Sequence, residues 1–181
     1  MSTIDTPIYH QDAPILPTAI KWGAISAVVA CVLVMIFYNI GLSEPGNMTG
    51  ALIAWVVTVG VGFVFGYLGL KNYRDGANEG NLTLGKGVVW GLIFGVVAGI
   101  IAAVFFYFFL TQLAPEFLNE MKALEIAKLE ESGVGDDQIE MSEDIFGYFM
   151  NAPVMASTQV LNKTISGLIY GLIGSLMLKN R

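Results

Sequence analysis

Few side chains in this sequence combine the residue types and the spacing that a reactive site requires. The chain has a single histidine, His10, and a single cysteine, Cys31, which excludes an internal disulfide framework and any metal site built from cysteines alone. Residues 85–87 read Gly-Lys-Gly, but the rest of a phosphate-binding loop is missing. The acidic residues of segment 116–144 lack the regular spacing of a calcium-binding loop. We therefore expect no catalytic residue, no metal ion and no bound cofactor.

A lipid anchor is the one further chemistry that Cys31 suggests, because residues 28–31 read Val-Val-Ala-Cys and resemble a lipoprotein cleavage box. A signal peptide begins with basic residues, whereas the segment before Lys21 carries Asp5 and Asp12 and no lysine or arginine. We favour the simpler interpretation, in which Cys31 is a small residue at a helix contact.

The composition is that of an integral membrane protein. The chain has 181 residues, of which 55% are apolar and 13% charged, whereas soluble domains carry about 25% charged residues. Its mean hydropathy is +0.65. A nucleic-acid binder needs a basic face, but here 9 Lys and Arg stand against 15 Asp and Glu. These figures exclude a soluble enzyme, a disordered tail and a nucleic-acid partner, and they make membrane lipids the expected surroundings.

Uncharged stretches mark the segments that are long enough to cross a bilayer. A spanning helix needs about 20 mainly apolar residues, and segments 22–43, 45–70 and 87–115 each exceed that length without a charged residue. The uncharged stretch 164–178 is shorter, but apolar residues continue upstream of it. We predict an all-α, integral membrane four-helix bundle with helices at about 18–41, 49–70, 86–113 and 158–178.

These boundaries leave Lys163 as the only candidate for an ionisable side chain embedded in the bilayer. A helix that begins near residue 158 would place it close to the membrane edge, with its ammonium group extending toward the lipid head groups. No Asp, Glu, His or Arg lies inside the predicted spans. This pattern disfavours proton coupling and the transport of charged substrates.

The distribution of lysine and arginine sets the expected orientation. These residues are enriched in short cytoplasmic loops, and one side of the predicted topology carries more of them than the other. The richer side holds Lys21, Lys71, Arg74, Lys86, Lys179 and Arg181, and the poorer side holds Lys122, Lys128 and Lys163. We expect a cytoplasmic tail at 1–17 and a single transmembrane domain at 18–181, with both termini on the cytoplasmic face of a bacterial inner membrane.

A long insertion, 114–157, separates the third and fourth predicted helices. We expect an amphipathic acidic helical hairpin here, because apolar residues recur at helical spacing in 115–132 and a second helix can run through Phe149 before Pro153 breaks the chain. Its acidic residues are a solvated face, a docking surface for a basic partner, or weak ligands for a divalent cation. The candidates for a partner surface are Glu125, Glu130, Glu131, Asp136 and Asp137.

Two pairs of matching segments indicate an internal duplication. Residues 22–30 and 90–98 agree at six of nine positions, and residues 66–72 and 174–180 agree at five of seven. Both copies enter the membrane from the same side. The bundle is therefore predicted to be a parallel duplication of a two-helix hairpin, about an axis along the membrane normal.

Small residues recur on every predicted helix at spacings of three and four. In lipid, such faces let helix backbones approach closely, which allows packing and interhelical hydrogen bonds to hold the helices together. We favour contacts within the bundle, with a homodimer contact through helix 86–113 as the alternative. The helix-packing candidates are Gly62, Gly66, Gly87, Gly91, Gly95, Gly99, Gly167 and Gly171.

Several short motifs follow one another in a recognisable order. A Trp22-Gly23 pair opens the first helix, Tyr73-Arg74 leads to Leu-Thr-Leu-Gly-Lys-Gly at 82–87, and Gly-Leu-Ile at 171–173 precedes the terminal Leu-Lys-Asn-Arg. With the acidic insertion, this order resembles a bacterial four-helix membrane family known as domain of unknown function 4199. The resemblance implies a multi-pass inner-membrane protein and supplies no activity, cofactor or catalytic residue.

These observations lead to two functional hypotheses. The first is a non-enzymatic accessory or scaffold subunit that presents the acidic hairpin to a protein partner. The alternative is a small pore or transporter for a neutral solute or lipid, assembled as an oligomer. A solid apolar interior favours the first, and a hollow polar interior favours the second.

Overall fold

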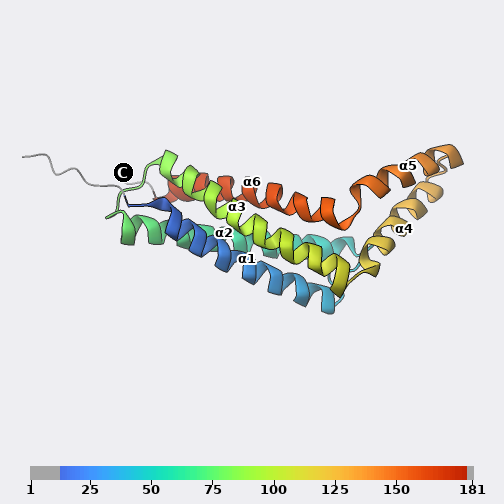
Figure 1. Cartoon of the computed structure of the whole chain (residues 1–181), viewed down its shortest axis with the longest axis horizontal. Coiled ribbons are helices and arrows are strands. Elements are labelled where there is room, and N and C mark those ends of the chain that lie inside the picture. The colour runs from blue at the N-terminus through green and yellow to red at the C-terminus, as the bar shows by residue number, and fades with distance from the viewer. Residues whose placement is uncertain (1–12, 179–181) are drawn as a thin grey trace, which may run out of the picture.

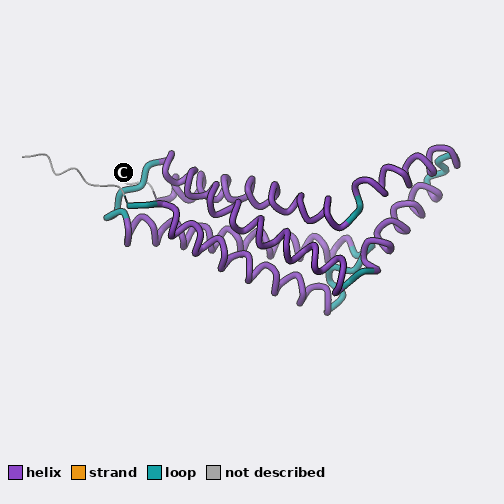
Figure 2. Tube along the Cα trace, viewed as in Figure 1, coloured by secondary structure: helices purple, strands orange, loops and turns teal. Residues whose placement is uncertain are grey.

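The computed structural model describes residues 13–178, in which helices are the only regular structure (Figure 1, Figure 2). The α-helices are α1 (Ile15–Asn39), α2 (Met48–Asn72), α3 (Leu84–Phe108), α4 (Glu116–Glu131), α5 (Asp136–Phe149) and α6 (Ala152–Leu178). Two π-helical turns, η1 (Tyr73–Ala77) and η2 (Phe109–Leu113), extend α2 and α3. The predicted contributions of His10, Lys179 and Arg181 lie outside the described residues.

Four of these helices are long and apolar enough to cross a membrane, as the sequence predicted. They are Ile15–Asn39, Met48–Gly76, Leu84–Leu113 and Ala152–Leu178, with mean hydropathies of 2.3, 2.1, 2.6 and 1.3. Each offers more residues than the roughly 20 that cross a hydrocarbon core. The fold class, a multi-pass all-helical membrane protein, is therefore confirmed.

The four long helices pack side by side as a closed ring. α1 contacts α2 and α3, while α6 contacts α3 and α2, and α2 also contacts α3 across the interior. The beginning of α1 and the end of α6 lie at one end of the ring, which we call the terminal end (Figure 1). The opposite end carries α4 and α5 and is called the arm end. The duplication and the cytoplasmic location of the terminal end stay predictions.

The fourth long helix begins earlier than predicted, at Ala152 instead of about residue 158. The side-chain oxygen of Asn151 accepts a hydrogen bond from the backbone N–H of Val154 at 3.0 Å and so satisfies a free donor of the first turn. Pro153 lies in that first turn, where its missing N–H costs nothing and its fixed φ suits the helix. The prediction that Pro153 breaks the chain before this helix was therefore wrong, since Pro153 lies inside α6. Lys163 follows the helix start by about three turns, which is further along the helix than a start near residue 158 implied.

The buried side chains form two separate clusters, one at each end of the ring. The cluster at the terminal end is built around Trp90, Tyr73 and Leu70, which are fully buried. The cluster at the arm end is built around Phe109 and Leu110. The middle of the ring, between these clusters, is the level at which Lys163 lies.

The helices α4 and α5 form an arm that projects beyond the ring (Figure 1). They contact each other, and Gly133, with a φ of +72°, supplies the left-handed residue that the turn between them requires. At the base, the ring of Phe117 lies 6.0 Å from that of Phe109 and 6.4 Å from that of Tyr38. The arm is therefore attached to the ring through aromatic contacts at its base.

Candidate functional site

Lys163 lines a small cavity inside the ring of helices. The cavity measures about 120 Å³, and all four long helices contribute to its wall. Its polar members are Thr58 from α2, Gln159 and Lys163 from α6, and Cys31 from α1. Its apolar members are Ala30, Val34, Ala102, Phe105 and Phe106.

A larger groove adjoins this cavity and opens to the side of the molecule. It measures about 680 Å³ and shares Val34, Thr58, Gln159 and Lys163 with the cavity. It extends to Ser43, which lies in the loop at the arm end. The other side chains that line it are Phe37, Ala54, Trp55, Val59, Asn162, Ile165, Ser166, Ile169 and Tyr170. Lys163 is therefore reached from outside the ring through a channel of mixed polarity.

Glycines of α3 fix the backbone of Lys163. A Cβ atom at Gly95 would lie 2.5 Å from the carbonyl oxygen of Lys163, and one at Gly99 would lie 2.7 Å from Cα of Val160. Real Cβ contacts are never that short, so this stretch of α6 can lie flat against α3 only because both positions lack a side chain. The Lys163 side chain leaves this contact and lines the cavity with residues of α1 and α2.

The hydroxyl groups around Lys163 are satisfied by nearby backbone carbonyls. Thr58 Oγ1 donates to Ala54 O at 2.7 Å, and Tyr170 OH donates to Val59 O at 3.1 Å. Among the described residues, the ammonium group of Lys163 makes no hydrogen bond or ion pair. Every fully buried side-chain nitrogen there has a partner, so the nitrogen of Lys163 is not fully buried. The ammonium group is thus left facing the open space of the cavity and groove.

No carboxylate is available in the four long helices to neutralise this charge. The sequences of α1, α2, α3 and α6 contain no Asp or Glu. A lysine at the centre of a membrane helix costs about 3 kcal/mol on insertion scales, and such residues usually face a partner or a water-filled cavity. The arrangement can therefore attract an anionic group or hold water.

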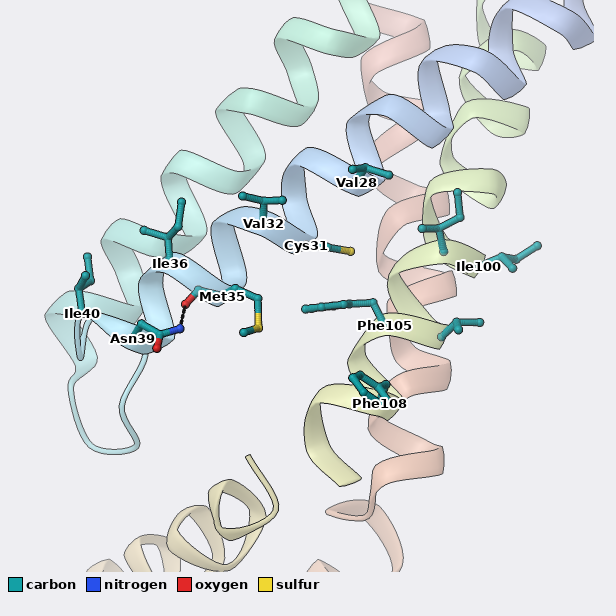
Figure 3. A pocket seen from close by; sticks show the side chains of 12 residues that line it. Val28, Cys31, Val32, Met35, Ile36, Asn39, Ile40, Ile100, Phe105 and Phe108 are labelled. Carbon is teal, nitrogen blue, oxygen red and sulfur yellow. Dashed lines mark hydrogen bonds between the residues drawn. The ribbon is translucent and has the colours of Figure 1, made fainter. Parts of the chain in front are cut away.

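An apolar groove of about 890 Å³ lies on another side, between α1 and α3 (Figure 3). Val28, Val32 and Ile36 line it from α1, and the side chains of Cys31 and Phe105 approach each other across it (Figure 3). Such a surface is suited to hydrocarbon chains and has almost no polar group for recognition.

Six of the predicted packing glycines lie where α3 meets α6. A Cβ atom at Gly91 would collide with the carbonyl oxygen of Gly167 and lie 2.8 Å from Cα of Gly171. A Cβ atom at Gly87 would collide with the hydroxyl group of Ser175. The two predicted positions of α2, Gly62 and Gly66, face the side chain of Tyr170 instead, at 3.2 Å from Cε2 and 3.1 Å from Cβ.

The predicted acidic surface lies on the arm, toward its tip. Glu130, Glu131, Asp136 and Asp137 are exposed where α4 ends and α5 begins. Glu125 is half-buried, and its Oε1 forms an ion pair with Nζ of Lys128 at 2.6 Å. Four of the five residues thus form one exposed cluster, while the fifth is partly neutralised.

Sequence reasoning missed an exposed apolar stripe on α5. Met141, Ile145 and Tyr148 are 65%, 43% and 78% exposed, and their spacing of four and three places them on one helix face. Phe149 extends the stripe and is also exposed. The spacing of these apolar residues was the signal that could have revealed the stripe.

The fold and this arrangement define a multi-pass membrane protein with a helical arm outside its spans. Within that class, the chain belongs to the family described as protein of unknown function DUF4199, whose profile matches residues 21–180. This match confirms the resemblance seen in the sequence. No curated protein and no solved structure matched the chain.

Proposed function

We propose that this protein is a non-enzymatic accessory or scaffold subunit of a bacterial inner membrane, with both termini in the cytoplasm and the arm outside. The observation that carries this proposal is the arm itself. Its tip bears four exposed acids, and its second helix bears an apolar stripe that no described residue covers. Apolar contact area beside a charged rim is the usual anatomy of a protein interface.

The charges of the tip point to a basic surface on the partner protein. Complementary charge accelerates encounter and selects among partners, and the apolar residues supply contact that persists once the partner is bound. The partner proposed here therefore combines lysine- or arginine-rich rims with an apolar patch that fits Met141, Ile145 and Tyr148.

We expect neutralisation of the tip to weaken capture of the partner about tenfold at low salt, because rim charges act mainly on the rate of association. The variant replaces Glu130, Glu131, Asp136 and Asp137 with the corresponding amides. The measurement is recovery of photocrosslinked partner from cells that carry a crosslinker at Tyr148, at low and high ionic strength.

A matched control removes the same charge elsewhere on the arm, at Glu116, Glu120, Glu140 and Glu143. This control variant should capture the partner nearly as well as the wild type. Recovery of the protein alone from wild-type cells, or equal capture by the two variants, contradicts the proposal.

A second candidate function is a small oligomeric pore or transporter for a neutral solute or lipid. The polar cavity and its side opening favour it, because they make the middle of the ring hollow where a pure scaffold needs no space. The cavity provides a polar space into which a lipid head group enters from the surrounding bilayer.

We expect the Thr58→Phe variant to abolish lipid flux if this candidate is correct, because the larger ring fills the space that Thr58 now lines. The measurement is exchange of labelled lipid between leaflets of liposomes that contain the purified protein. A Gly60→Ala variant is the control, since nothing lies within 4 Å of a Cβ atom there. Liposomes with wild-type protein that exchange lipid no faster than empty liposomes rule out this candidate.

A further inference from the structure

The cavity around Lys163 lies at the middle depth of the four long helices. The residues that each of the other helices contributes fall near the centre of its uncharged stretch: Cys31 within 22–43, Thr58 within 45–70, and Ala102 within 87–115. Charged residues mark the ends of these stretches, so their centres lie near the middle of the bilayer. The ammonium group of Lys163 is therefore held far from both head-group layers.

A cation at this depth requires a partner that the described chain does not supply. The long helices contain no carboxylate, and the neighbouring hydroxyl hydrogens of Thr58 and Tyr170 are already donated to backbone carbonyls. The oxygens of those hydroxyls accept from donors but carry no negative charge. An external anion therefore gains more at this site than at any exposed lysine, where water already solvates the charge.

The shape of the site determines what kind of anion can reach it. The groove begins beside Ser43 at the arm end and runs along α6 past Asn162 to Lys163. Apolar side chains such as Ile165 and Ile169 line it beside the polar ones, and it opens to the side where hydrocarbon chains lie. Its volume of about 680 Å³ falls within the range of roughly 300–1,000 Å³ that is typical of sites for small molecules.

We propose that this groove binds a membrane amphiphile with an acidic head group, whose anionic oxygens pair with the ammonium group of Lys163 while its hydrocarbon chain lies along the open side. Gln159 and Asn162 supply amide N–H groups that can donate to the same oxygens. The shared chemistry is a carboxylate or phosphate joined to a chain. This binding requires neither the scaffold role nor transport.

The test is native mass spectrometry of the full-length protein, titrated in a neutral detergent with matched ligands. Oleate is compared with oleyl alcohol, and phosphatidylglycerol with phosphatidylcholine, so that each pair differs in charge while the chains match. We expect each acidic member to bind at least about tenfold more tightly than its neutral counterpart, as one charge-assisted contact provides. The stronger of the two acidic ligands identifies the carboxylate or the phosphate as the preferred head group.

Substitutions at Lys163 connect this selectivity to the site. Lys163→Met keeps most of the length of the side chain and removes its charge, and it should abolish the preference for acidic ligands, whereas Lys163→Arg should retain it. Lys71→Met is the matched control, because this lysine is exposed at the end of α2 and should leave the preference unchanged. A preference that survives in Lys163→Met overturns the proposal.

Three further outcomes are decisive without any variant. Equal affinity of the wild-type protein for the acidic and neutral members of each pair overturns the proposal, even if Lys163→Met fails to fold. Inorganic phosphate is added in excess as the free-anion arm of the experiment. The proposal is supported if a second amphiphile displaces bound oleate and inorganic phosphate does not. Saturable binding of inorganic phosphate with no binding of amphiphiles overturns the proposal.

Discussion

A leucine in place of Gly91 is expected to separate α3 from α6 and to destabilise the protein by about 3 kcal/mol or more. Overpacking of a tight contact typically costs 1–3 kcal/mol, and more when the neighbours cannot give way. Here the neighbours are backbone atoms, since a Cβ atom at Gly91 would collide with the carbonyl oxygen of Gly167. The reciprocal position is equally closed, because a Cβ atom at Gly167 would lie 2.7 Å from Cα of Gly95.

The measurement is the free energy of unfolding in mixed micelles, followed by loss of helicity and by cysteine accessibility at Cys31. Gly60→Leu is the matched control, because Gly60 lies within a long helix and nothing is within 4 Å of a Cβ atom there. We expect this control variant to have the same free energy of unfolding as the wild type. Equal stability of the Gly91→Leu and Gly60→Leu variants would show that the close approach of α3 and α6 is not needed for the fold.

Replacing Trp90 with alanine is expected to cost about 3–5 kcal/mol, the usual range for removal of a large buried aromatic side chain. Trp90 has no exposed surface. Its ring stacks on Phe94 at a centroid distance of 5.2 Å, and its Nε1 donates a hydrogen bond to Thr18 Oγ1 at 3.1 Å. The cost here is mainly lost packing, because lipid is as apolar as the interior that the ring leaves.

Trp55 provides the comparison within the same chain, because its side chain is 64% exposed. We expect Trp55→Ala to change the free energy of unfolding by less than about 1 kcal/mol. Trp90→Phe should fall between the two alanine variants, since it keeps an aromatic ring and loses the hydrogen bond to Thr18. A Trp90→Ala variant as stable as Trp55→Ala would place the core elsewhere.

The membrane spans could be predicted because they depend on a local quantity, the length of uncharged sequence. The position of Lys163 near the middle of its span could not be predicted in this way. Ser157, Thr158 and Gln159 make the start of α6 resemble a loop, and the Asn151 cap that begins the helix earlier is a single hydrogen bond. The hydroxyl groups of Ser157 and Thr158 are exposed and donate to backbone carbonyls of the same helix at 2.7 Å. Only Gln159 of the three lines the cavity, and the arrangement of the other helices decides which residues of α6 face it.

The pairing of helices was also beyond the sequence. Small residues recur on every long helix, so their spacing indicates close approach without naming the neighbour. In the structure, the stripe of α3 meets backbone of α6, whereas Gly62 and Gly66 of α2 accommodate the ring of Tyr170. The choice depends on the complementary shape of two complete surfaces, which a one-dimensional pattern does not contain.

The attachment of the arm has a mechanical consequence. α4 follows α3 through η2, and α5 leads into α6 through a short link at residues 150–151. A load applied at the tip of the arm is therefore delivered to α3 and α6 together, the two helices whose backbones are in direct contact. These two helices therefore move together, and α1 receives part of the load directly through the contact between Tyr38 and Phe117. A displacement of this pair therefore changes how α6 lies against α2 and how α3 lies against α1.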